Sequence, residues 1–133
     1  MSWIDVVDDP RGIRAIYGAR VPALVRAVLH EIRLHRDGPR VTFVVDLPEY
    51  PRSPPRRWAA QRFNTVQIHL TVDGVHSVTI NGLSTTSVVD LELMKVGDEV
   101  RAVTSAKSSS VVDVRGRWAW VNKISAYLVD TAG

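Results

Sequence analysis

The stretch Thr65-Val66-Gln67-Ile68-His69-Leu70-Thr71-Val72 decides the fold, because apolar and polar side chains alternate along its whole length. Successive side chains of a β-strand point to opposite faces, so this pattern is typical of a strand with one buried face. The same period of two runs through residues 28–34, 41–47 and 78–81. These segments predict an antiparallel sheet, since antiparallel sheets commonly bury one face and leave the other in water.

The first predicted hairpin joins the strands at residues 28–34 and 41–47. Proline has no N–H group, so a two-residue turn at Asp37-Gly38 would ask Pro39 for a hydrogen bond that it lacks. A four-residue loop from Asp37 to Arg40 removes that demand. It predicts Leu34 opposite Phe43.

A second hairpin is predicted between the strands that contain Ile68 and Ile80. A two-residue turn would set Ile68 opposite the polar Thr79 and so bury a hydroxyl group. A three-residue loop that ends at Val75 sets Ile68 opposite Ile80 instead. The hydrophobic pattern favours the three-residue loop.

Short helices are predicted before the sheet. Ser2 and Asp5 form a variant of the capping box, and a second helix starts with Asp9 as its N-cap and ends at Gly18. Further strands are predicted at residues 89–93, 100–103, 111–114 and 118–128. Residues 1–133 therefore form a single α+β domain: a mostly antiparallel, strongly bent sheet of about seven or eight strands with one or two short N-terminal helices.

The connection Leu47-Pro48-Glu49-Tyr50-Pro51-Arg52-Ser53-Pro54-Pro55-Arg56-Arg57-Trp58 is long, stiff, basic and aromatic. Buried peptide groups need partners and proline supplies no donor, so we expect this segment at the surface. Arginine and large aromatic residues are enriched at binding hot spots. The candidate partner-binding residues are Tyr50, Arg52, Arg56, Arg57, Trp58 and Arg62. In an alternative interpretation, Trp58 and Phe63 fold inward and pin the segment to the sheet.

Charge is distributed unevenly along the chain. The net charge is +3, yet residues 11–62 carry eleven arginines against four carboxylates, a local balance of +7. A basic face attracts polyanions or an acidic protein surface. The excess positive charge surrounds the proline-rich segment.

Residue types and spacings give no sign of catalysis. The absence of cysteine excludes disulfides and thiolate metal sites. His30 lies on the predicted core side with no nucleophile or carboxylate placed beside it by local spacing. Trp118 and Trp120 share a face of the last strand with Ile124, which favours core packing, with a tryptophan-lined ligand cavity as the alternative. We expect no enzyme activity, no cofactor and no metal site.

The sequence also predicts a cytoplasmic location. The N-terminus has no basic stretch followed by an apolar run, and no apolar stretch reaches membrane-spanning length. We therefore expect a soluble cytoplasmic protein that does not bind membranes.

Several strings of residues carry a resemblance to a known family. They are Trp3-Ile4-Asp5, Tyr17-Gly18, Leu29-His30-Glu31, Leu34-His35-Arg36-Asp37-Gly38-Pro39, Asp46-Leu47-Pro48-Glu49-Tyr50-Pro51, Phe63-Asn64-Thr65-Val66-Gln67 and Lys123-Ile124-Ser125-Ala126-Tyr127. In these strings the chain resembles the immunity protein 50 family of bacterial polymorphic toxin systems. The resemblance implies a small cytoplasmic α+β protein that binds and neutralises a cognate toxin domain. It implies no enzyme activity and assigns no toxin-contacting residues, and the oligomeric state stays open.

A nucleic-acid-binding domain that uses the basic, aromatic face around residues 50–62 is the main alternative. For such a face we expect only weak, non-specific binding, with dissociation constants of about 10⁻⁴ to 10⁻⁶ M at physiological salt. An inhibitor that mimics nucleic acid is expected to be acidic, whereas the first half of this chain is basic. A toxin with an acidic surface, or blockade away from the toxin's active site, fits the charge better.

Overall fold

A computed structural model describes residues 2–82, 88–106 and 111–130. Eight strands form one sheet in the order β4-β7-β6-β5-β1-β2-β3-β8, and every neighbouring pair is antiparallel. The elements are η1 (Trp3–Asp5), α1 (Arg11–Tyr17), β1 (Ala27–His35), β2 (Arg40–Asp46), α2 (Arg56–Ala60), β3 (Thr65–Asp73), β4 (Ser77–Asn81), β5 (Val88–Val96), β6 (Glu99–Ser105), β7 (Val111–Gly116) and β8 (Trp118–Tyr127). This architecture agrees with the predicted α+β class, while the degree of bending stays a prediction.

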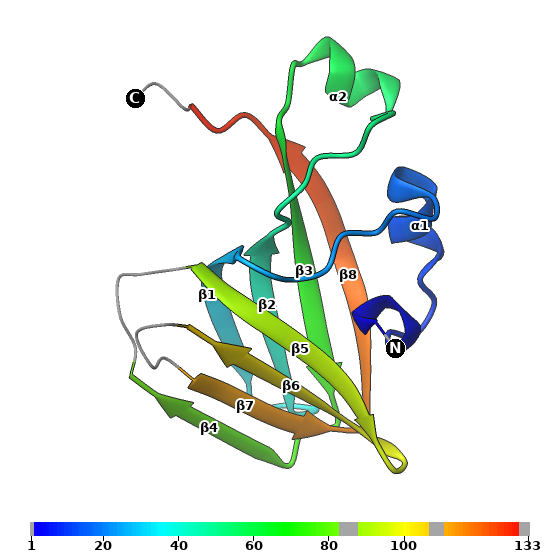
Figure 1. The fold of residues 1–133 in the computed structure, drawn as a ribbon. Coiled ribbons are helices and arrows are strands. Elements are labelled where there is room, and N and C mark those ends of the chain that lie inside the picture. Colours follow the sequence, from blue (N-terminus) through cyan, green and yellow to red (C-terminus); the bar gives the residue numbers. More distant parts are fainter. Residues whose placement is uncertain (1, 83–87, 107–110, 131–133) are drawn as a thin grey trace.

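The sheet has two halves with a narrow junction. Among the described residues, only Ala27 and Val28 of β1 pair with β5, opposite Val89 and Val88. Figure 1 shows β4, β7, β6 and β5 lying across the β1-β2-β3-β8 half, and β3 and β8 also contact β7 and β6 respectively. The core lies between the halves, and its largest fully buried side chains include Phe43, Ile68, Leu70, Val45, Val66 and Val114.

The N-terminal segment forms the two short helical elements predicted for it. The Ser2 amide donates to the Asp5 carboxylate over 3.1 Å, as in a capping box. Helix α1 ends at Gly18, whose φ of +64° suits glycine. The predicted N-cap is wrong by one residue, because Pro10 occupies that position; the Asp9 carboxylate accepts from both the Arg11 side chain and the Arg11 amide.

The predicted register of the β1–β2 hairpin is wrong by two residues. The loop has four residues as predicted, but it spans 36–39, and His35 pairs with Arg40. Leu34 therefore lies opposite Val41 rather than Phe43 and is 59% exposed. Pro39 stays in the loop, where its missing N–H group costs no ladder bond and its carbonyl accepts from Val75.

The predicted hairpin between β3 and β4 is also wrong. Strand β3 lies between β2 and β8, while β4, within the described part of the chain, pairs only with β7 at the far edge of the sheet. The chain leaves β3 through Gly74 at φ +65°, and the His76 amide then donates to the Arg115 carbonyl over 3.0 Å. The turn therefore carries the chain from one half of the sheet to the other instead of reversing it.

A bulge in β8 overturns the predicted placement of two tryptophans. The β3–β8 register shifts between His69 and Leu70, so Ile124 lies opposite the buried Ile68 while Trp120 lies opposite Thr71 on the other face. One inserted residue moves every later side chain to the opposite face. Trp118 is 47% exposed on that outer face, so the predicted core packing of both tryptophans is wrong.

Candidate functional site

The segment between β2 and β3 contains a helix that the sequence analysis missed. Helix α2 begins directly after Pro55, whose carbonyl accepts hydrogen bonds from the amides of Trp58 and Ala59 at 2.9 and 3.1 Å. Proline suits the start of a helix because its φ is already helical and its missing donor is not needed there. A proline followed by Arg-Arg-Trp-Ala-Ala is the signal that predicts this turn.

Two of the six candidate residues serve mainly as anchors. The rings of Tyr50 and Trp58 lie 6.4 Å apart at 40° to each other, and both half-buried side chains pack against the core. Aromatic pairs at such distances contribute about 0.5–1.5 kcal/mol beyond the area that they bury. The Tyr50 hydroxyl is buried without a partner in the described part of the chain, and burial raises its pKa. Apolar packing therefore holds this segment on the body of the protein, as the alternative interpretation of Trp58 proposed.

The other four candidate residues are exposed cations. Among the described residues, no hydrogen bond or ion pair involves the guanidinium groups of Arg52, Arg56, Arg57 and Arg62. Several arginines elsewhere are paired: Arg101, for example, binds Asp113 with a nitrogen to oxygen distance of 2.6 Å. The segment thus presents positive charge that its own fold does not neutralise.

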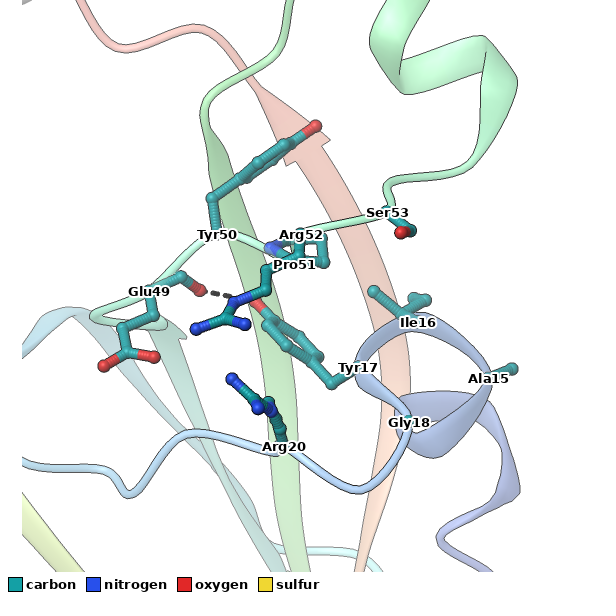
Figure 2. Close-up of a pocket in the computed structure, with 10 residues that line it drawn as sticks. All are labelled: Ala15, Ile16, Tyr17, Gly18, Arg20, Glu49, Tyr50, Pro51, Arg52 and Ser53. Atoms are coloured by element: carbon teal, nitrogen blue, oxygen red, sulfur yellow. Dashed lines mark hydrogen bonds between the residues drawn. The ribbon is translucent and has the colours of Figure 1, made fainter.

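A pocket of about 420 Å³ lies beside this segment, between the end of α1 and residues 49–53. Tyr17 and Arg20 line it from one side, and Glu49 and Arg52 line it from the other (Figure 2). The Tyr17 hydroxyl donates to the Glu49 carbonyl over 2.7 Å and so ties the loop to the helix. Burial, with smaller contributions from Tyr50 and Glu49, raises the pKa of Tyr17, so the phenol remains a donor at neutral pH.

His30 lies in a polar network on the outer face of the sheet rather than on the predicted core side. A bulge at His30 shifts the β1–β2 register, and its Nε2 atom lies 2.7 Å from a carboxylate oxygen of Asp46. Gln67 and Tyr127 also donate to the buried Asp46 carboxylate, and burial raises the pKa of Tyr127, with the Asp46 hydrogen bond as a second cause. The sequence missed this carboxylate because β2 and β3 bring Asp46 and Gln67 to His30 from distant positions.

This network has the geometry of a structural cross-link between strands. It links β1, β2, β3 and β8 through one carboxylate, which accepts from three side chains. The His30 Nε2 atom also lies 3.3 Å from the Tyr127 hydroxyl, and among the described residues no serine or threonine hydroxyl bonds to it. A satisfied carboxylate with three donors holds strands in place.

The structure describes no membrane-spanning helix and no metal-binding cluster in residues 2–82, 88–106 and 111–130. No helix among them is long and apolar enough to cross a membrane. They also contain no group of three or more histidine, aspartate or glutamate side chains arranged to hold a metal ion.

The fold and the site define a class: a small α+β protein with one antiparallel sheet and a cationic surface segment anchored by aromatic residues. Within that class, the chain belongs to the immunity protein 50 family, whose model matches residues 9–127. No curated protein and no solved structure matches the chain at a significant level. The family match covers the candidate segment, the pocket and both halves of the sheet.

Proposed function

We propose that this protein is a cytoplasmic immunity protein that binds a cognate toxin domain of a polymorphic toxin system and neutralises it by stoichiometric protein–protein contact. The observation that carries the proposal is the row of unpaired guanidinium groups on an anchored surface segment, in a chain of the immunity protein 50 family. The toxin-binding face includes Arg52, Arg56, Arg57 and Arg62, with Tyr50 and Trp58 as its supports.

Anchoring gives this segment an energetic advantage as a binding surface. A flexible loop loses conformational entropy when it binds, and this loss subtracts from affinity. Here Tyr50 and Trp58 pack on the core, and the Tyr17 hydroxyl fixes the Glu49 carbonyl. The segment is therefore ordered before the partner arrives, and its arginines can steer an acidic partner during encounter.

Direct binding of nucleic acid remains the second candidate function, because the same guanidinium groups attract phosphates. Against this candidate, the segment offers no exposed aromatic ring for base stacking. Tyr50 and Trp58 are half-buried against the core, whereas base stacking needs open ring faces. We expect weak, non-specific and strongly salt-dependent binding to nucleic acid. Affinity that depends on sequence at physiological salt would make this candidate the better one.

Co-expression with the toxin domain encoded beside this gene tests the proposal. We expect rescue of growth and a stable complex on size-exclusion chromatography, with no turnover of toxin or of its substrates by this protein alone. Failure of both rescue and complex formation would contradict the proposal. The elution volume of the complex, compared with each protein alone, also gives the stoichiometry.

A further inference from the structure

We propose that the pocket between α1 and residues 49–53 receives a single carboxylate group of the toxin, with Arg20 and Arg52 as its two ligands. The identity of the occupant rests on the proposed function. The two arginines come from segments more than thirty positions apart, and both line the same pocket of about 420 Å³. In Figure 2 their guanidinium groups point into the same space beside the Tyr17 ring.

Electrostatics makes this space a receptor for an anion. Both guanidinium groups are solvent-exposed, and within the described residues neither has an ion pair or a hydrogen bond. Two like charges directed into one pocket repel each other. An anion placed between them adds one attraction to each charge and so offsets this repulsion. A guanidinium group presents a planar fork of donors that matches the two oxygens of a carboxylate. Arg20 and Arg52 can therefore bind one carboxylate from two sides.

Turns and hydrogen bonds fix the backbone at both arginine positions before any partner arrives. Gly18, at φ +64°, turns the chain at the end of α1, and the Arg20 amide then donates to the Tyr17 carbonyl over 3.2 Å. On the other side, Arg52 follows the buried Pro51, and the Tyr17 hydroxyl binds the neighbouring Glu49 carbonyl. The two walls of the pocket are thus joined by a hydrogen bond, which reduces the entropy that binding must overcome.

The rim of the pocket favours a carboxylate over a nucleic-acid backbone. Glu49 lies at the rim with its carboxylate outside ion-pair distance of either arginine, so the two cations and one anion leave a net charge of +1. One incoming carboxylate neutralises that charge. A run of phosphates would bring further negative charges toward Glu49, and the pocket lies at the small end of the range for ligand sites. An aspartate or glutamate side chain of a protein partner carries the single negative charge that the pocket needs and is small enough to enter it.

A nuclear magnetic resonance titration of the full-length protein tests the pocket without the toxin. The probe is N-acetyl-glutamate methylamide, and the matched control is the glutamine analogue, which differs only in lacking the charge. We expect saturable shifts of the Arg20 and Arg52 Nε–Hε signals with the glutamate probe, at dissociation constants in the millimolar range. The glutamine analogue should leave both signals in place.

Single substitutions test whether the glutamate probe binds in the pocket. Arg20→Gln and Arg52→Gln should each weaken the glutamate probe at least about fivefold, while the exposed Arg36→Gln in the β1–β2 loop should leave its affinity unchanged. Well-dispersed amide spectra of all variants verify the fold. The proposal is overturned if neither arginine signal shifts, if the glutamine analogue shifts them equally, or if Arg36→Gln has the same effect as the pocket variants.

Two more measurements separate the possible failures. A six-nucleotide thymidine oligomer that binds the same two arginines more tightly than the glutamate probe would replace the carboxylate with a nucleic acid. In co-expression, rescue that is unaffected by the Arg20→Gln/Arg52→Gln double variant would refute the toxin carboxylate while leaving the proposed function intact. Absence of rescue by the unmodified protein would refute the proposed function, and the titration would still decide whether the pocket binds a carboxylate.

Discussion

Reversing two charges on α2 tests the proposed interface most directly. Arg56→Glu/Arg57→Glu replaces two exposed side chains whose guanidinium groups have no partner among the described residues. No hydrogen bond or ion pair among the described residues is lost, so we expect the free energy of unfolding to change by at most about 0.5 kcal/mol. The local charge nevertheless changes by four units. The variant should fold like the parent protein and differ only in what it binds.

The expected loss of toxin affinity follows from the exposure of both arginines. An exposed ion pair contributes about 0.2–1 kcal/mol, and a charge reversal replaces that attraction with repulsion of similar size. For two residues the combined range is about 0.8–4 kcal/mol. Within it we expect a loss of about 1.4 kcal/mol or more, which is a rise of at least about tenfold in the dissociation constant. Because these charges lie at the surface, most of the change should appear in the association rate and should shrink at high salt. Biolayer interferometry with the toxin domain at two salt concentrations measures both quantities.

A matched variant separates a local effect from a change in net charge. Arg36→Glu/Lys95→Glu also takes the net charge from +3 to −1, at two exposed positions in the hairpins far from α2 in Figure 1. It should bind the toxin within about twofold of the parent, since both hairpins lie at the opposite end of the molecule from α2 and the interaction of exposed charges is largely screened beyond a Debye length of about 8 Å. If the α2 variant binds as tightly as the parent, or if the control loses as much affinity, the segment at residues 50–62 is not the interface.

Three further predictions concern stability. Trp58→Ala should lower the free energy of unfolding by about 2–3 kcal/mol in urea titrations, somewhat less than a fully buried aromatic, because Trp58 is half-buried against the core. Gly116→Ala should lower it by about 1–3 kcal/mol in thermal unfolding, because a Cβ atom there would lie 2.7 Å from the Asp73 carbonyl oxygen. Arg101→Gln should destabilise the protein at pH 7 but not in strong acid, because the Arg101 hydrogen bond lowers the pKa of Asp113. Because the pKa of Asp113 is lower in the folded protein than its ordinary value of about 3.9, its charge stabilises the folded state fully above that ordinary value. The stabilisation is lost as the pH falls through the folded-state pKa.

A second glycine, in α1, provides the control for Gly116→Ala. Gly12→Ala lies in α1, where a Cβ atom would lie at van der Waals distance, 3.4 Å, from the Ile124 side chain, so it should stabilise the protein by up to about 1 kcal/mol. An equal loss in both glycine variants would show that the close approach at Gly116 is not the cause. A Trp58→Ala variant as stable as the parent would mean that the ring does not anchor the segment. A deficit of Arg101→Gln that persists below pH 2 would not arise from the Asp113 charge.

The sequence predicted the strands far better than their partners. The alternation in residues 41–47 and 65–72 marks strands because burial of one face imposes a period of two. It carries no information on which strand lies next to which, and β3 pairs with β8, almost fifty residues further along the chain. Loop-closure entropy grows only slowly with length, so distant pairing costs little more than a hairpin. A choice between a local and a distant partner therefore depends on packing that periodicity does not describe.

Bulges account for the errors on the outer face. A single inserted residue in β8 moved Trp118 and Trp120 out of the core, and one in β1 placed His30 beside Asp46. Such an insertion leaves the apolar pattern on either side intact, and only the phase between the two sides changes. In β8 the core-facing positions change from odd to even between Val121 and Ile124, whereas the even spacing of Trp118, Trp120 and Ile124 predicted one continuous face.

The six candidate residues formed one set in the sequence, and the structure divides them by role. The arginines are exposed and unpaired, whereas Tyr50 and Trp58 hold the segment on the core. Spacing along the chain could not make this division, because it depends on which side chains reach the core from a segment that contains a helix. Under the proposed function, we expect truncation of an anchor to change both folding and binding, and reversal of an arginine to change binding alone. A loss of toxin affinity with unchanged stability is therefore the result that identifies a residue of the interface.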